Sequence, residues 1–167
     1  MKYDREVVAA IARWAPVYGV RIDPYLVHAI IEQESNHGRA LWTNEGGGRY
    51  SWGPMMVLDS TAKGLGYPNP SALIDPPLGI LAGVKYLATL VKRYPGQLAR
   101  AVASYNAGPS APDARGRYPN QPYVDRVLSF QRLYAMGSGA AAPQTAGLLL
   151  GTLVLFLLSR RRRRAFA

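Results

Sequence analysis

Apolar residues recur at helical spacing through most of this chain, and that repeat limits the fold more than any other feature. The longest example lies between two prolines at 77 and 95 and consists of Ile80, Val84, Leu87 and Val91. Spacing of three to four residues places side chains on one face of a helix, whereas a half-buried strand alternates every second residue. No alternation of that kind continues for long, so the sequence predicts a mainly α domain.

Start and stop signals divide the chain into further helices. The second helix is predicted to begin at Asp23-Pro24, a capping carboxylate followed by proline at the first helical position. It is predicted to end near Gly38, which can adopt the left-handed conformation of a helix C-cap. The other predicted helices are 4–18, 61–65, 77–94, 97–105 and 122–134. The glycine-rich stretch 45–49 and the proline-rich stretch 109–120 are predicted to be loops.

The C-terminal part has a different composition. Residues 140–159 are apolar apart from Pro143, Gln144 and small hydroxyl residues, and residues 160–164 are all arginine. About 20 apolar residues span a bilayer core of ~30 Å, and a basic run suits the cytoplasmic side. We therefore expect this segment to span a membrane, with membrane lipid as a partner. The alternative is that it forms a buried helix of the domain. The expected organisation is a helical domain at 1–135, a flexible linker at 136–145, a transmembrane helix at 146–159 that in its longest form begins near 140, and a basic tail at 160–167.

Charge and composition exclude several kinds of function. The chain has 20 basic and 10 acidic residues, and without the five arginines at 160–164 the net charge is +5, which fits an anionic partner. The basic residues are scattered rather than clustered, which argues against nucleic acid as a specific ligand. There is no cysteine, so disulfides and thiolate metal sites are excluded, and His28 and His37 are the only histidines. We expect no metal and no cofactor.

One carboxyl group interrupts an apolar stripe in the second predicted helix. The residues on this stripe are Val27, Ile30, Ile31 and Glu34. Burial disfavours the charged form and raises the pKa of a carboxyl group, as a general acid near neutral pH requires. Position alone leaves another interpretation open, in which Glu34 lies at the rim of the core and pairs with an arginine.

Short motifs follow Glu34 in a fixed order. They are Glu34-Ser35, Ser51-Trp52-Gly53-Pro54-Met55, Ser60-Thr61-Ala62, Asp75-Pro76, Gly83-x-x-Tyr86-Leu87, Ser104-Tyr105-Asn106-Ala107-Gly108-Pro109 and Tyr123-Val124-x-x-Val127. Each motif is weak by itself. Together, over roughly residues 11–134, they resemble the lytic transglycosylases related to goose-type lysozyme, the family of the soluble-transglycosylase (SLT) domain. The resemblance implies a lysozyme-like helical domain that acts on the glycan strands of peptidoglycan.

The same resemblance implies roles for five residues. Glu34 would be the sole catalytic carboxylate, protonating the bond between N-acetylmuramic acid and N-acetylglucosamine. It would then accept the proton of the muramoyl C6 hydroxyl, which gives a 1,6-anhydro product without hydrolysis, because this hydroxyl replaces the second carboxylate of ordinary glycosidases. Ser51 would bind the sugar near the acid, and Met55 would line the floor of the groove. Tyr105 would place its hydroxyl near Glu34, and Asn106 would help to hold that wall.

Some residues depart from the family pattern or have two interpretations. Met56 stands where the family has glutamine, Pro54 where leucine is common and Gly79 where asparagine is usual, which affects substrate contacts more than Glu34. The aromatic residues that either stack on sugars or pack in the core are Trp42, Tyr50, Trp52, Tyr118 and Tyr123. The candidates for a second carboxylate are Glu45, Asp59 and Asp75, each with a simpler role as a solvated, capping or turn residue.

Two other functions and several locations remain open. The chain is alternatively a goose-type lysozyme that hydrolyses the bond, or a wall-binding membrane protein whose groove has lost activity. Residues 1–6 carry charges where a secretory signal needs an apolar core, so we expect no signal peptide. Arginines on the cytoplasmic side would place the helical domain on the side of the wall. We expect an enzyme of a bacteriophage virion that opens the wall for genome entry or lysis. A secretion or conjugation machine is the alternative, and either would supply virion or envelope partners.

Overall fold

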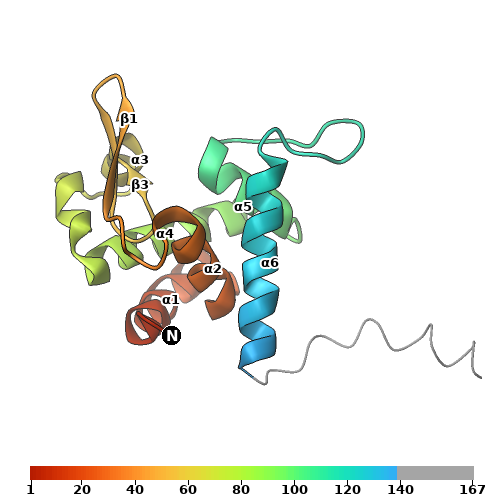
Figure 1. Ribbon diagram of the computed structural model, residues 1–167, viewed down its shortest axis with the longest axis horizontal. Coiled ribbons are helices and arrows are strands. Elements are labelled where there is room, and N and C mark those ends of the chain that lie inside the picture. The colour runs from red at the N-terminus through yellow and green to blue at the C-terminus, as the bar shows by residue number, and fades with distance from the viewer. Residues whose placement is uncertain (139–167) are drawn as a thin grey trace, which may run out of the picture. The chain divides into compact units, whose positions relative to one another are not determined.

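The computed structural model describes residues 1–138, and its secondary structure is mainly helical, which confirms the predicted mainly α character of the domain. The helices of this part are α1 (Asp4–Tyr18), α2 (Pro24–Ser35), α3 (Asp59–Gly64), the short 3-10 helix η1 (Pro70–Ile74), α4 (Pro76–Arg93), α5 (Leu98–Ala107) and α6 (Gln121–Gly137). The strands are β1 (Trp42–Gly46), β2 (Arg49–Trp52) and β3 (Val57–Leu58). Figure 1 shows their arrangement.

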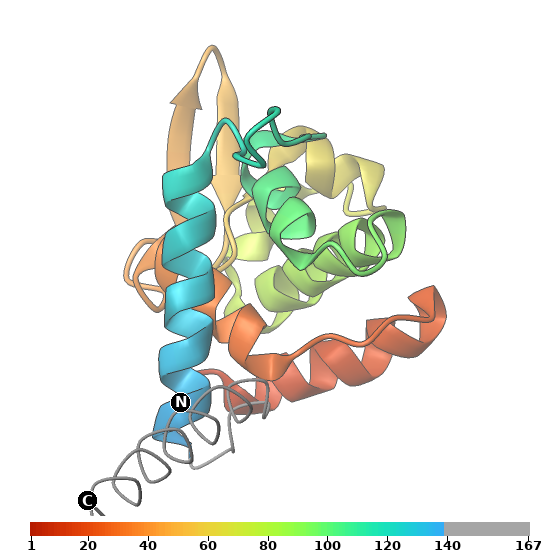
Figure 2. The ribbon, with the colours of Figure 1, turned by 90° about the vertical axis from the view of Figure 1, so that its right-hand side faces the viewer.

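Helix α4 is the centre of the core. Its inward face carries the apolar repeat seen in the sequence, of which Ile80, Val84 and Leu87 are fully buried. Helices α1 and α5 both pack against α4, as Figure 2 shows. Because full burial of one such side chain contributes ~1.5–3 kcal/mol, this face fixes the positions of the helices around it.

The sequence analysis missed a three-stranded antiparallel sheet and the short helix η1. Strand β1 pairs with β2, which places Trp42 opposite Trp52 and Thr43 opposite Ser51, and β2 pairs with β3. Residues Gly46 to Gly48 all have positive φ and form the turn of the β1–β2 hairpin, which projects away from the helices in Figures 1 and 2. The prediction of a loop at 45–49 was therefore wrong for its two ends. The strands have only five, four and two residues, which is too short for the alternation of apolar and polar residues to be recognised in the sequence.

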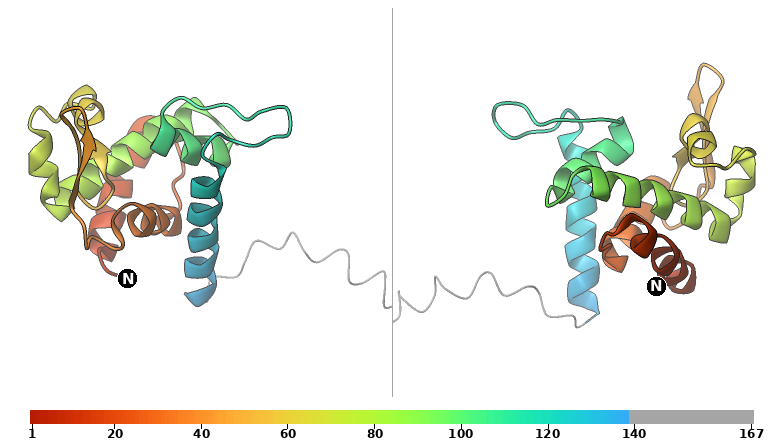
Figure 3. Two further views of the ribbon diagram at one scale, coloured as in Figure 1. Left: turned by 45° about the horizontal axis from the view of Figure 1, so that its top comes forward. Right: turned by 180° about the vertical axis from the view of Figure 1, so that it is seen from behind.

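The end of the described chain is helical. Helix α6 continues to Gly137, so the first two residues of the predicted linker belong to a helix. The predicted loop at 109–120 connects α5 to α6 and is visible in both views of Figure 3. Within residues 1–138 we find no helix with the length and apolar character needed to cross a bilayer. The predicted transmembrane helix 146–159 and the basic tail lie outside the described residues.

Candidate active site

Glu34 occupies the last turn of α2. The Asp23 side chain caps the start of this helix by accepting a hydrogen bond from the backbone N–H of Tyr25 at 3.0 Å, as its sequence predicted. The inner face of the helix is fully buried through Val27, Ile30 and Ile31. Glu34 follows on that face and is partly buried, so the apolar stripe ends in a carboxyl group at the edge of the core.

The partner of Glu34 is a tyrosine and not an arginine. The hydroxyl of Tyr123, in the first turns of α6, donates a hydrogen bond to Oε1 of Glu34 at 2.5 Å. Tyr123 is itself buried, which fixes the direction of its hydroxyl. The sequence analysis gave Tyr123 a role in sugar stacking or core packing and missed this contact. The motif that contains Tyr123 was visible, but the sequence separation of 89 positions hides the proximity of the two residues.

Burial sets the protonation of the candidate acid. It raises the pKa of Glu34 from 4.5 to about 7, because surroundings of low polarity disfavour the carboxylate. The hydrogen bond from Tyr123 acts in the opposite direction, and the negative charge of Glu45 raises the pKa further. A group with a pKa of about 7 is present in both forms at neutral pH. Glu34 can therefore donate a proton and accept one in the same reaction cycle.

Glu34 lines a cavity of about 610 Å³, a volume typical of small-ligand sites. The hairpin contributes the side chains of Thr43, Glu45, Arg49 and Ser51. The segment from Met56 through α3 contributes Met56, Val57, Leu58 and Thr61. Helices α4 and α5 contribute Tyr86 and the run Tyr105 to Gly108. Most of these groups are polar, which suits a hydroxyl-rich ligand such as a sugar.

Four of the five residues predicted for the site lie at this cavity, namely Glu34, Ser51, Tyr105 and Asn106. Ser51 is in β2 and is largely buried. Asn106 lies near the end of α5, where its Oδ1 accepts a hydrogen bond from Nδ2 of Asn120 at 2.9 Å. The cavity thus joins residues from three separate motifs, while their contacts with a substrate stay predictions.

Met55 is placed differently from its prediction. Its side chain is fully buried against Gly83 of α4 and is not among the side chains that line the cavity. Met56 lines the cavity instead. Its φ of 45° lies in the left-handed region and turns its side chain away from the core. A thioether therefore faces the cavity where the family resemblance expects the amide of glutamine.

Tyr105 supports the site without bonding to the acid. Its hydroxyl donates to the backbone carbonyl of Met55 at 2.9 Å, and its ring centroid lies 5.0 Å from that of Tyr86. The predicted place of this hydroxyl beside Glu34 is taken by Tyr123. Burial raises the pKa of Tyr105 well above its ordinary value, and the nearby charge of Glu34 adds to this, so the hydroxyl stays a donor. Tyr105 thus ties α5 to the turn after β2.

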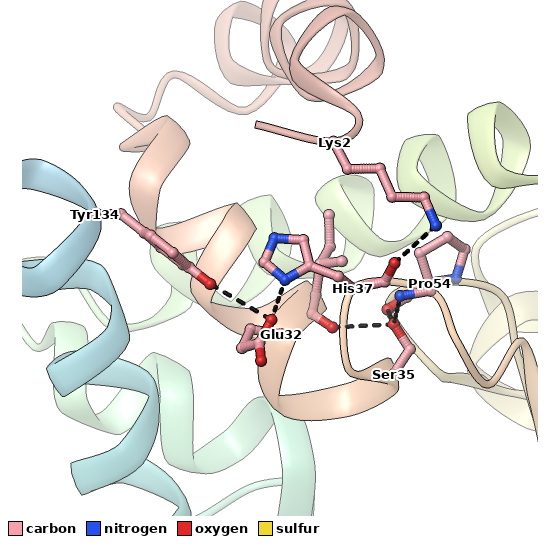
Figure 4. Close-up of polar contacts among 8 residues, drawn as sticks. Lys2, Glu32, Ser35, His37, Pro54 and Tyr134 are labelled. Atoms are coloured by element: carbon pink, nitrogen blue, oxygen red, sulfur yellow. Dashed lines mark hydrogen bonds and ion pairs between the residues drawn. The ribbon is translucent and has the colours of Figure 1, made fainter. Parts of the chain in front are cut away.

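Ser35 connects the helix of the acid to the same turn. Its buried hydroxyl lies 2.7 Å from the carbonyl oxygen of Pro54 and 2.9 Å from that of Ile31, and it accepts a hydrogen bond from the backbone N–H of Gly38 at 2.8 Å. Figure 4 shows this cluster. The hydroxyl therefore joins three segments: the end of α2, the reversal after it and the turn that follows β2.

The two histidines pair with carboxylates outside the cavity. Nε2 of His28 lies 2.9 Å from Oδ1 of Asp4, and burial lowers the pKa of His28, so its ring is neutral at physiological pH. Nδ1 of His37 contacts Oε2 of Glu32, as Figure 4 shows. Across residues 1–138 no cluster of three or more histidine, aspartate or glutamate side chains is arranged to hold a metal ion.

A helical domain with a small antiparallel sheet and one partly buried glutamate at a polar cavity is consistent with the class of lysozyme-like domains. Within that class, the family described as the transglycosylase SLT domain matches residues 15–123. This match covers more than half of the chain. The chain therefore belongs to the transglycosylase SLT domain family.

Two curated relatives have the same degree of similarity. They are the membrane-bound lytic murein transglycosylases F of Vibrio vulnificus strains YJ016 and CMCP6. Each is 35% identical to this chain over 105 residues, which amount to 58% of this chain and 18% of the relative. The chain thus spans less than a fifth of the length of the relatives it matches, and the similarity concerns one domain of them.

Proposed function

We propose that this chain is a peptidoglycan lytic transglycosylase in which Glu34 is the single catalytic acid and base. The observation that carries the proposal is the partly buried carboxyl group of Glu34, with a pKa raised to about 7, held by Tyr123 at the wall of a polar cavity. Membership of the SLT family supports the reaction class, as does the name of the relatives, which describes them as lytic murein transglycosylases.

In the proposed reaction one proton leaves Glu34 and one returns. Protonated Glu34 donates its proton to the glycosidic oxygen as the bond from that oxygen to the anomeric carbon of N-acetylmuramic acid breaks. The C6 hydroxyl oxygen of the same sugar then bonds to that carbon, and its proton passes to the carboxylate of Glu34. Because the nucleophile is part of the substrate, its effective concentration is very high and no further carboxylate is needed.

Replacement of the acid by its amide tests the proposal. Glu34→Gln keeps an acceptor for the Tyr123 hydroxyl but cannot transfer a proton, so we expect the release of fragments from purified peptidoglycan to fall by about 10³-fold. Glu6→Gln, a change of the same kind in α1 and outside the cavity, is the matched control and should cleave normally. Mass spectrometry of the parent's fragments should find 1,6-anhydro ends. Cleavage by Glu34→Gln at the rate of the control would rule the mechanism out.

Hydrolysis is a second candidate, because Glu45 lines the same cavity as Glu34. A carboxylate there could activate a water molecule for attack on the sugar, as in glycosidases that use two carboxylates. Reducing ends in the released fragments, together with a large loss of rate in Glu45→Gln, would favour this reaction. Anhydro ends with little effect of Glu45→Gln would favour transglycosylation.

We also propose that residues 146–159 attach the protein to a membrane, with phage virions as the location. The support is the apolar composition of this segment, the five arginines after it and the words "membrane-bound" in the name of the relatives. Flotation of the full chain with lipid vesicles, compared with a chain ending at residue 138, tests the attachment. Equal flotation of the two would exclude it. Proteomics of purified virions and of uninfected envelopes tests the location, and presence in uninfected envelopes alone would exclude the virion.

A further inference from the structure

The β1–β2 hairpin has two faces of different character. Side chains alternate along strands, and the cavity side carries Thr43, Glu45, Arg49 and Ser51. The intervening positions, which are not among the residues lining the cavity, are Trp42, Asn44, Tyr50 and Trp52. The outer face of the hairpin therefore bears three aromatic rings and one amide and no charged side chain.

The three rings form one cluster, called here the aromatic platform and made of Trp42, Tyr50 and Trp52. Their centroids are 5.8 to 6.4 Å apart, and the ring planes differ by 30° to 46°. Asp59, the first residue of α3, holds the inner part of the platform. Its carboxylate accepts a hydrogen bond from the indole N–H of Trp52 at 2.7 Å and another from the backbone N–H of Tyr50 at 3.0 Å. The platform thus rests on a fixed base.

Hairpin stability accounts for only part of this arrangement. The cross-strand pair of Trp42 and Trp52 stabilises an isolated hairpin, as aromatic pairs do. However, the side chain of Trp42 remains 54% exposed. Among residues 1–138 it is the one aromatic residue in the group of exposed large apolar side chains. A ring needed only for packing would gain more by being covered. The exposed face of Trp42 is therefore available to a ligand.

We propose that the aromatic platform is a second glycan-binding surface, on which a pyranose ring of a peptidoglycan strand stacks outside the catalytic cavity. The apolar C–H face of the sugar would lie on Trp42, with Tyr50 and Trp52 beneath and beside it. Asn44 would supply polar contact, since its Oδ1 is used by the backbone N–H of Gly46 while its NH₂ group has no partner within the described residues. This proposal rests on the proposed function, because it takes its ligand from the same polymer.

The chemistry of this face favours a sugar over other occupants. An anionic membrane or nucleic acid would require basic side chains beside the rings, and the outer positions of the hairpin provide none. Uncharged rings with an amide at the edge match the alternating apolar and polar character of a pyranose. The hairpin also forms a wall of the cavity on its other face, so one strand pair would contact glycan on both sides.

Substitutions at Trp42 test the platform. In the Glu34→Gln background, which holds glycan without cutting it, Trp42→Ala should weaken binding to purified peptidoglycan about tenfold. Trp42→Phe keeps a flat ring and should stay within about threefold of the parent. Leu133→Ala removes another exposed apolar side chain, on α6, and should bind as the parent does. Equal binding by the Trp42→Ala and parent chains would overturn the proposal.

A second measurement does not depend on any substitution at the platform. A soluble oligomer of N-acetylglucosamine should protect the tryptophan emission of the Glu34→Gln chain from quenching by acrylamide, because Trp42 is the exposed tryptophan. Absence of protection at saturating oligomer would overturn the proposal even if Trp42→Ala fails to fold. Protection by phospholipid vesicles but not by the oligomer would do the same and would assign the platform to a lipid surface.

These outcomes separate the platform from the proposed function. If the parent does not cleave peptidoglycan but Trp42→Ala still loses binding, the catalytic proposal fails and the platform stands. If the parent cleaves and Trp42→Ala binds normally, only the platform fails. With both correct, Trp42→Ala in the active chain should slow the digestion of whole peptidoglycan more than that of short soluble fragments, because a long strand can contact the cavity and the platform together whereas a short fragment occupies one of them at a time.

Discussion

At Glu34, burial and a single hydrogen bond act on the same carboxyl group in opposite directions. Burial raises its pKa to about 7, and the Tyr123 hydroxyl lowers it, because that donor stabilises the carboxylate. Tyr123 also fixes the direction of Oε1. Its removal should therefore alter the proton affinity and the position of the acid together.

The pH dependence of cleavage provides the first test at this scale. The first step needs protonated Glu34, so the rate should fall as the pH rises through about 7. In Tyr123→Phe the pKa should rise, which moves this alkaline limb to higher pH, while the lost positioning lowers the maximal rate about tenfold or more. Tyr118→Phe is the control. A limb that moves to lower pH in Tyr123→Phe would contradict the assigned role of the hydroxyl.

The same pKa makes a prediction about stability. Because the folded-state pKa of about 7 exceeds the ordinary value of 4.5, the contribution of Glu34 to stability is fully present below pH 4.5 and is lost as the pH rises through 7. Glu34→Gln does not ionise, so at pH 8 it should unfold with a free energy about 2 kcal/mol above that of the parent, after allowance for partial exposure. Urea unfolding at pH 4 and pH 8 measures this, and an equal difference at both values would contradict it.

At the scale of elements, the turn after β2 packs closely on α4. The first Cβ atom at position 79 would lie 2.4 Å from the carbonyl oxygen of Leu73 and 2.9 Å from Cδ of Pro54. Pro54 and Gly79 are two of the departures from the family pattern, and they are in contact. The small residue at 79 therefore makes room for the proline at 54.

Because of this contact, we expect replacement of a helical glycine by alanine to destabilise the protein at position 79 and not at position 64. Gly79→Ala places a methyl group against backbone atoms and should lower the free energy of unfolding by about 1–3 kcal/mol, although alanine favours helix. Gly64→Ala in α3 meets nothing within 4 Å and should be neutral or slightly stabilising. Chemical denaturation of both variants checks this. Equal stability of the two would mean that the turn moves freely away from α4.

The elements also show how far the sequence leads. The helix ranges and the position of Glu34 follow from local signals, since the repeat of apolar residues and the cap at Asp23 are visible within a few positions. The short strands and the contact of Tyr123 with Glu34 depend on tertiary packing, which local spacing does not encode. The sequence predicted Met55 at the cavity, whereas the structure buries Met55 and places Met56 there, and local spacing does not reveal the positive φ of Met56.

For the domain as a whole, charge is the property that acts on a partner over the longest distance. Residues 1–138 contain 15 of the 20 basic residues and all 10 acidic ones. The ion pairs found among these residues use the N-terminal amine or a histidine, so the arginine and lysine charges of this part of the chain have no carboxylate partner. Such charges attract an anionic polymer over a distance set by salt.

Binding of the Glu34→Gln chain to purified peptidoglycan should therefore depend on ionic strength. Raising the salt from ~0.01 M to ~1 M shortens the screening length from ~30 Å to ~3 Å, and we expect the association rate to fall at least tenfold. Stacking on the aromatic platform is not electrostatic, so the ratio between the parent and Trp42→Ala should stay constant. An association rate independent of salt would contradict the charge argument.

The hydroxyl of Ser35 has a consequence for protein engineering. Since it fastens the end of α2 to the turn at Pro54, the distance between the acid and that turn is set without help from the tip of the hairpin. Residues can therefore be inserted or exchanged around Gly47 while the carboxyl group keeps its place. A library of variants that changes only the residues around Gly47 is therefore a direct way to search for chains that bind wall polymers with other chemical modifications.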